Sequence, residues 1–141
     1  MPNMYHPYDT RLDHRAIGSA ALTATTTLAT ITERAAQRTA YRTLATLGTT
    51  KISANNELYQ LVAELSNDDF TTVVVAGVTD FGATEVRQSG APDSAAGDTA
   101  ELLWTTEHNG IKYDTARIRL VISGTSPSIV ISSHSTILKD L

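Results

Sequence analysis

The side chains best suited to metal binding or acid–base chemistry are four histidines, His6, His14, His108 and His134. No two of them have the spacing of a helical or hairpin metal site, and no carboxylate is placed to complete one. Cysteine is absent, which excludes disulfides, thiolate chemistry and cysteine-based zinc sites. We therefore expect surface histidines, with His134 at an outward strand position, and neither a metal nor a cofactor.

The run Ser66-Asn67-Asp68-Asp69 offers a group of oxygen atoms that could bind calcium. It lacks the alternating acidic positions and the distant bidentate glutamate of an EF-hand loop. Asn and Asp at the end of a strand normally form hydrogen bonds with their own backbone. The run is therefore interpreted as a turn, with a cation site as the alternative.

Nucleophilic catalysis has many serines and threonines to draw on but no supporting motif. The sequence contains no G-x-S-x-G elbow, G-x-G-x-x-G, P-loop or H-E-x-x-H pattern. The acidic residues are scattered, which is compatible with a glycosidase carboxylate pair without indicating one. We expect a protein that is not an enzyme and has no small-molecule substrate.

Trp104, the only tryptophan, is the one large aromatic side chain with two competing interpretations. On an exposed sheet it could stack against a sugar, with Tyr113 as a second member of the platform. Alternatively it belongs to the core or to an interface, because an indole ring buries a large area. Leu102 and Trp104 share one face of their strand while Leu103 points the other way. Trp104 is also a candidate contact with a capsid or with a second copy.

These side chains must be positioned by short β-type runs, because threonine and valine are abundant and no helical period is sustained. Asn109-Gly110 predicts a type I′ hairpin turn, since both residues tolerate positive φ, and Gly124-Thr125-Ser126-Pro127 breaks the chain before the last strand. We expect strands at Leu28–Thr32, Ala40–Leu47, Tyr59–Leu65, Thr71–Asp80, Ala83–Arg87, Glu101–Glu107, Ile111–Ile122 and Ile129–Leu138. The predicted fold is all-β: a two-sheet antiparallel sandwich, specifically a jelly roll of about eight strands with an extended N-terminal arm.

Two regions are expected along the chain: an N-terminal arm at residues 1–24 and the β-sandwich domain at residues 25–141. The arm has prolines and tyrosines but no period, so it is interpreted either as a strap that becomes ordered against a partner, over Met1–Gly18, or as a frayed terminus. Its candidate contacts with a capsid or a second copy are Tyr5, His6, Tyr8 and Arg11.

Length and charge narrow the possible partners. The 141 residues suit one domain, and the net charge of -4 comes without any cluster of basic residues, so no nucleic-acid partner is expected. The longest apolar run, Val73–Val78, is far too short to cross a bilayer, and residues 1–15 have no apolar signal-peptide region. We expect synthesis in the cytoplasm, without secretion by the usual route and without membrane insertion.

Two stretches carry a resemblance to a known family. They run from Tyr59-Gln60-Leu61 to Ser66–Phe70, and from Tyr113 through Arg117-Ile118-Arg119 to Ser123–Ile129. Together they resemble the jelly-roll capsid cement, or decoration, proteins of tailed bacteriophages, typified by the one on the Bordetella phage head. The resemblance is best over residues 59–138, looser over 21–32, and does not cover 1–18.

The resemblance implies a viral structural protein on the outer surface of the virion capsid, made in the host cytoplasm. Its partners would be the major capsid protein, whose neighbouring subunits it bridges, and a second copy in a homodimer. It implies no enzyme activity and no cofactor. It carries over only the Ser66–Asp69 turn and the Gly124–Pro127 corner as shape-setting positions. With the hairpin turn, the shape-setting residues are Ser66, Asn67, Asp68, Asn109, Gly110, Gly124 and Pro127.

Other functions on the same fold remain open. A virion adhesion or carbohydrate-binding module would need a planar row of exposed aromatics, for which only Trp104 and Tyr113 are plausible. A small-molecule β-barrel would need an apolar cavity, whereas the small alanine and threonine side chains favour close sheet packing. A small hydrolase is disfavoured by the missing motifs.

Overall fold

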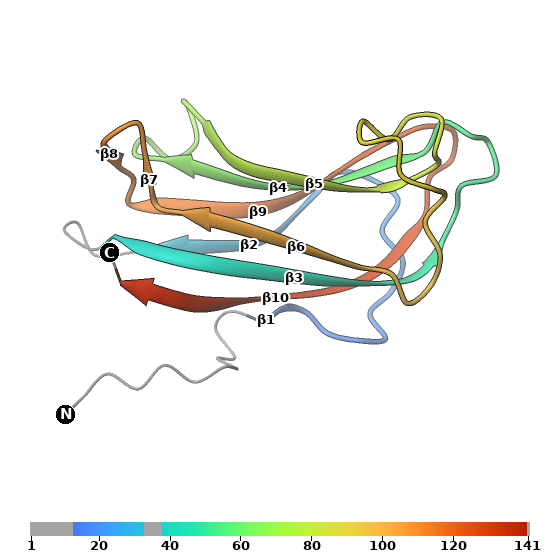
Figure 1. The fold of residues 1–141 in the computed structure, drawn as a ribbon, viewed down its shortest axis with the longest axis horizontal. Coiled ribbons are helices and arrows are strands. Elements are labelled where there is room, and N and C mark those ends of the chain that lie inside the picture. The colour runs from blue at the N-terminus through green and yellow to red at the C-terminus, as the bar shows by residue number, and fades with distance from the viewer. Residues whose placement is uncertain (1–12, 33–37, 141) are drawn as a thin grey trace.

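The computed structural model describes residues 13–32 and 38–140, and within these ranges the chain forms strands and no helix (Figure 1). No described segment is therefore a helix that could cross a membrane. The strands are β1 (Asp13–Arg15), β2 (Thr26–Thr32), β3 (Thr39–Thr50), β4 (Leu58–Ser66), β5 (Val74–Gly82), β6 (Thr99–Thr105), β7 (Glu107–His108), β8 (Ile111–Lys112), β9 (Thr115–Ser123) and β10 (Ile129–Asp140).

The strands form two four-stranded antiparallel sheets that pack face to face, in the orders β1-β10-β3-β6 and β2-β9-β4-β5 (Figure 1). The small β7-β8 hairpin is separate from both sheets. In each sheet the pairs are nested along the sequence, because β4 pairs with β5, β3 with β6, β2 with β9 and β1 with β10. A nested set of antiparallel pairs rolled into two sheets is a jelly roll. The predicted all-β sandwich is confirmed.

Alternation along the strands places the core between the sheets. On β9, Ala116, Ile118 and Leu120 are buried, while Arg117 and Arg119 point outward as the sequence predicts. The inward residues of β4, from Tyr59 to Leu65, are fully buried and pair across with β9 and β5. The core is mainly aliphatic, as the scarcity of aromatic residues requires.

Three predicted strands differ from those observed. Ala83–Arg87 forms a turn, in which the Val86 and Arg87 N–H groups both donate to Ala83 O. The two predicted strands Glu101–Glu107 and Ile111–Ile122 are each interrupted, because Tyr113 N–H donates to Thr106 O where the chain leaves the sheet and forms the β7-β8 hairpin.

The predicted arm is described only from residue 13 onward, and this part belongs to the sandwich. β1 pairs with β10, and the backbone of Leu22 exchanges two hydrogen bonds with that of Ile129. Leu22 also packs against the core. The physical reason is that β3 pairs with only one edge of β10. The other edge would be left open, and β1 pairs with it. The candidate contacts at Tyr5, His6, Tyr8 and Arg11 lie outside the described residues.

Candidate functional site

The Ser66–Asp69 run folds into a tight hydrogen-bonded turn between β4 and β5. Ser66 Oγ accepts hydrogen bonds from the N–H groups of Asp68 (3.1 Å) and Phe70 (2.9 Å), and its hydroxyl donates to Asp68 Oδ1 (2.7 Å). The Thr72 N–H donates to the same carboxylate at 2.8 Å. This backbone contact, followed by the Ser66 hydroxyl, lowers the pKa of Asp68.

The geometry of this turn supports the turn interpretation over the cation interpretation. Asp68 is occupied by backbone and hydroxyl donors, and Asn67 is occupied as well, because its side-chain amide bridges Lys112 O and the Asp114 N–H. Across the described residues, no group of three or more histidine, aspartate or glutamate side chains is placed to hold a metal ion.

The other two shape-setting turns adopt backbone conformations that few residues tolerate. Asn109 and Gly110 have φ values of 51° and 78°, which suit the type I′ hairpin turn that joins β7 and β8. Gly124 has φ 114°, and a Cβ there would lie 2.7 Å from both Asn56 O and Glu57 Cα. Pro127 follows Ser126, whose φ is 45°. The Gly124–Pro127 corner thus needs a glycine at position 124 and a left-handed backbone conformation at Ser126.

Hydrogen bonds join the Gly124–Pro127 corner to the loop between β3 and β4. The Thr125 N–H donates to Asn56 Oδ1, and Asn56 Nδ2 donates back to Thr125 Oγ1. Lys51 Nζ donates to Thr125 O at 2.6 Å and lies 3.4 Å from the fully buried carboxylate of Glu57. The Tyr59 hydroxyl donates to Lys51 O at 2.7 Å.

Glu57 is the most enclosed charged group at this end of the sandwich. Burial alone raises the pKa of its carboxyl group. The backbone N–H groups of Ala54, Asn56 and Glu57 itself, together with the Lys51 ammonium, outweigh burial and hold the pKa below its ordinary value. Glu57 is a structural carboxylate that organises the loop, since its oxygens are saturated by these donors.

A row of polar side chains crosses the inner face of the sheet β1-β10-β3-β6. His14 Nε2 lies 2.6 Å from Ser135 Oγ, and Ser135 Oγ lies 2.7 Å from Thr43 Oγ1. Trp104 Nε1 donates to Thr43 Oγ1 at 2.9 Å, and the indole stacks on Tyr41 with ring centroids 4.5 Å apart. The row therefore connects one side chain from each of the four strands, and we call it the inner polar row.

The inner polar row contains a serine–histidine contact, which is the first requirement of a hydrolase nucleophile. Ser135 is only 1% exposed, and its hydroxyl is shared with Thr43 inside the sandwich. A substrate would have to enter the core to reach it, so the row serves sheet cohesion. Trp104 is 3% exposed, which makes its core interpretation correct and removes it from the candidate surface contacts.

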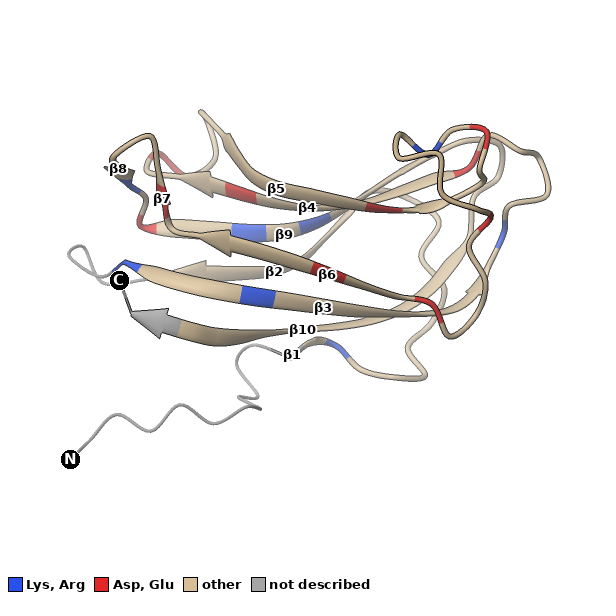
Figure 2. Cartoon of the chain, in the orientation of Figure 1, with Lys and Arg blue, Asp and Glu red and all other residues tan. Residues whose placement is uncertain are grey.

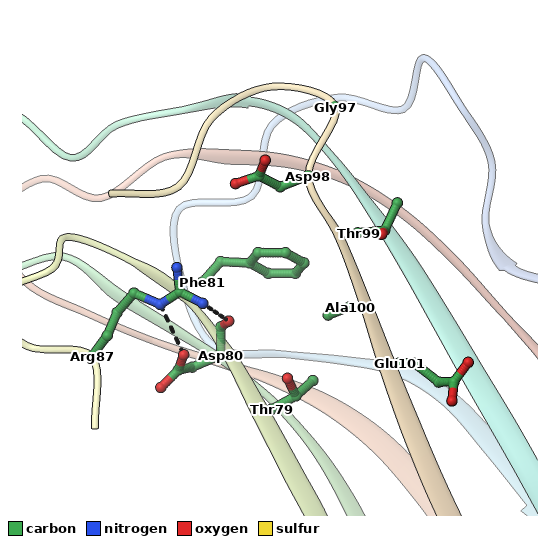
Figure 3. Close-up of a pocket in the computed structure, with 9 residues that line it drawn as sticks. All are labelled: Thr79, Asp80, Phe81, Arg87, Gly97, Asp98, Thr99, Ala100 and Glu101. Atoms are coloured by element: carbon green, nitrogen blue, oxygen red, sulfur yellow. Dashed lines mark hydrogen bonds and ion pairs between the residues drawn. The ribbon is translucent and has the colours of Figure 1, made fainter. Parts of the chain in front are cut away.

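A hollow of about 600 Å³ lies between the end of β5 and the start of β6 (Figure 3). Arg87 turns toward Asp80 there, with 3.0 Å between Nε and Oδ1, and Nη2 donates to Asp80 O. The same guanidinium donates to Pro92 O and Ser94 Oγ, so it secures the loop after β5. The Arg87 guanidinium thus makes four hydrogen bonds within the protein, which gives it a structural role at this hollow.

The outer face of the sheet β2-β9-β4-β5 carries the most distinctive charge arrangement. Figure 2 shows two basic positions on β9 beside an acidic position on β4. Glu64 Oε1 accepts from Arg117 Nε at 2.7 Å and lies 3.3 Å from Arg119 Nη1. The Arg117 guanidinium also lies over the Phe70 ring, 4.3 Å from its centroid. Two cations therefore share one carboxylate, and we call Glu64, Arg117 and Arg119 the outer triad.

Aliphatic side chains adjoin the outer triad along the edge strand. In the register of β4 with β5, Val75 lies opposite Glu64 and Val78 lies opposite Val62. Val75 and Val78 are both 49% exposed. Arginine is enriched in protein interfaces, and the exposed valines beside it add apolar area that a partner could bury. The outer triad and these valines form the candidate functional site, which we call the arginine–valine face.

Sequence reasoning placed Arg117 and Arg119 on the outward side of their strand but assigned them no role. Glu64 was part of an alternating strand, and its outward position follows from the buried residues on either side of it. What the sequence could not supply is the pairing register that sets Glu64 beside Arg117 and Arg119. No family model matches the chain, and neither a curated protein nor a solved structure matches it.

Proposed function

We propose that the protein is a capsid cement, or decoration, protein that binds the outer surface of an assembled phage head and bridges major capsid subunits. The observation that supports this most is the distribution of exposed aliphatic side chains over two opposite faces. Val75 and Val78 lie on the outer side of one sheet, and Leu103, 59% exposed, lies on the outer side of the other. A bridging protein needs two such contact surfaces.

The two faces are close together at one side of the sandwich. β5 and β6 are edge strands of different sheets. They lie next to each other, as the Leu102 side chain of β6 shows by filling the space above Gly77 of β5. A single copy can therefore offer both contacts across one seam between capsid subunits. Its free strand edges are a further means of pairing with a partner or with a second copy in a homodimer.

A cement protein stabilises a shell by mass action, because it binds a surface that exists only in the assembled state. A difference of about 1.4 kcal/mol per copy is a tenfold change in the binding equilibrium. Many copies on a symmetric shell multiply this effect, so each individual contact needs only modest strength.

The test uses heads that lack this protein, to which purified full-length protein is added back. We expect saturable binding and restored resistance to heat and osmotic shock, both of which need the exposed valines. A Val75→Asp/Val78→Asp variant should bind more weakly, whereas Ile111→Asp, at an exposed aliphatic position in the β7-β8 hairpin, should bind like the wild type. Heads that are equally robust with and without the protein would overturn the proposal.

The adhesion or carbohydrate-binding alternative has less support than the cement function. It relied on Trp104 and Tyr113 as an exposed aromatic row, but Trp104 is buried and Tyr113 is partly buried against the core. A glycan-array screen of the full-length protein separates the two functions, since specific saturable glycan binding favours adhesion.

A further inference from the structure

The outer triad has more hydrogen-bond donors than its own carboxylate can occupy. Glu64 is contacted by Arg117 through Nε and by Arg119 through Nη1. No other hydrogen bond is made by either guanidinium within the described chain, which leaves donors of both arginines to the solvent. Their side chains are 22% and 29% exposed, against 11% for Glu64. The triad thus presents one net positive charge on an acidic protein.

The β4–β5 turn holds this charge in place at a conformational cost. Phe70 has φ 62°, a left-handed conformation that bulky residues rarely adopt, and its N–H donates to Ser66 Oγ. This conformation places the Phe70 ring against the Arg117 guanidinium. Backbone strain of this kind persists where the surrounding structure imposes it, and it is concentrated at functional sites.

We propose that the arginine–valine face binds a protein surface that presents a carboxylate surrounded by aliphatic side chains. The incoming carboxylate is held by the solvent-facing donors of Arg119 and Arg117, while Val75 and Val78 bury its aliphatic surroundings. Arginine suits this role because its planar guanidinium can bind a carboxylate through two parallel hydrogen bonds. This inference rests on the proposed function for the identity of the partner, which is then the outer surface of the capsid.

Charge complementarity decides between this partner and a second copy of the chain. A two-fold contact centred on the arginine–valine face would bring the same patch of both copies together. The arginines of one copy would then face those of the other, and like charges in contact are unfavourable. A homodimer is therefore expected to use another surface, leaving this face for an acidic partner.

The first experiment measures binding of full-length variants to heads that lack the protein. Arg119→Gln removes one cation while the short Arg117–Glu64 contact stays in place, and we expect binding about tenfold weaker. The matched control is Arg38→Gln, which removes an exposed arginine that pairs with Glu107 at 3.0 Å, away from this face. Equal binding by Arg119→Gln and wild type, or an equal loss in Arg38→Gln, would overturn the inference.

The second experiment does not depend on the capsid, so it separates the two proposals. Poly-L-glutamate is titrated into the isotope-labelled full-length protein, and the arginine Nε–Hε signals are followed by NMR. We expect saturable shifts at Arg117 and Arg119 that decrease with added salt, no comparable shift at Arg38, and none with poly-L-lysine. If the signals of Arg117 and Arg119 do not shift, or if the Arg38 signal shifts as much as theirs, the carboxylate site is refuted. Shifts at the triad without any binding to heads refute only the cement function.

Val78→Asp is a second variant that tests the same face without altering the triad. It places a carboxylate where the acidic partner would pack, so binding to heads and to poly-L-glutamate should both fall. Thermal unfolding of each variant, followed by circular dichroism, establishes that it is folded before its binding is compared.

Discussion

Replacing Thr43 with valine tests whether the inner polar row stabilises the sandwich. The substitution keeps the shape of the side chain but removes Oγ1, which accepts from Trp104 Nε1 and contacts Ser135 Oγ. The indole N–H is then buried without an acceptor, at a cost of about 2 kcal/mol, and the weakened Ser135 contact adds about 1 kcal/mol. The new methyl group recovers about 0.8 kcal/mol. The net loss in unfolding free energy is about 2 kcal/mol.

Urea unfolding followed by tryptophan fluorescence is a direct assay, since Trp104 is the only tryptophan. The control is Thr46→Val on the same strand, where the threonine side chain is exposed and the change should stay within about 0.5 kcal/mol. In a Trp104→Phe background, where far-UV circular dichroism replaces fluorescence because the only tryptophan is gone, Thr43→Val should cost clearly less, since the indole donor is absent. A Thr43→Val protein as stable as the wild type, or costs that simply add in the double variant, would show that the row contributes no hydrogen-bond energy.

Two further substitutions test the corner between the β3–β4 loop and β10. Glu57→Gln should lower the unfolding free energy by about 2 kcal/mol at pH 7, because an amide oxygen replaces a carboxylate that several donors surround. Since folding lowers the pKa of Glu57 from its ordinary value of 4.5, its contribution is present above that pH and disappears as the pH falls. The difference between wild type and Glu57→Gln in urea unfolding should therefore shrink in acid, and a difference independent of pH would contradict this. Gly124→Ala should destabilise by about 3 kcal/mol, because its Cβ would strike backbone atoms of Asn56 and Glu57. Gly90→Ala, also at positive φ but facing open space, should cost only about 1 kcal/mol, and equal costs would rule out the steric explanation.

The fold was predictable because period-2 alternation and turn chemistry act locally. The burial of Tyr59, Leu61 and Leu65 against the outward Glu64 follows from alternation on one strand. The Asn109-Gly110 turn follows from the two residues themselves. The predicted strand at Ala83–Arg87 was wrong, because the composition of this short run does not reveal that β5 ends at Gly82. At that point Gly82 lies in close contact with Glu57.

The candidate site was less accessible to sequence reasoning, because it depends on which strands become neighbours. Glu64 and Arg117 are 53 residues apart in sequence and meet only through the pairing of β4 with β9. The inner polar row needs four strands from both ends of the chain, including β1, which the sequence placed in a separate arm. The available signal was threonine and serine at inward strand positions, since buried hydroxyl groups are normally hydrogen-bonded. The sequence alone does not show which side chains are their partners.

The place of the arginine–valine face within the jelly roll bears on how it can bind. Glu64, Arg117 and Arg119 lie on β4 and β9, the two central strands of their sheet, and not on loops. The contacts with Glu64 already restrain the side chains of Arg117 and Arg119, so they lose less conformational freedom on binding and more of the contact energy is available as affinity. The valines are on the edge strand β5, where a partner can reach them and the free backbone edge at once. A rigid charged centre beside an accessible aliphatic edge suits a partner that is itself rigid and repeated many times, as a capsid surface is.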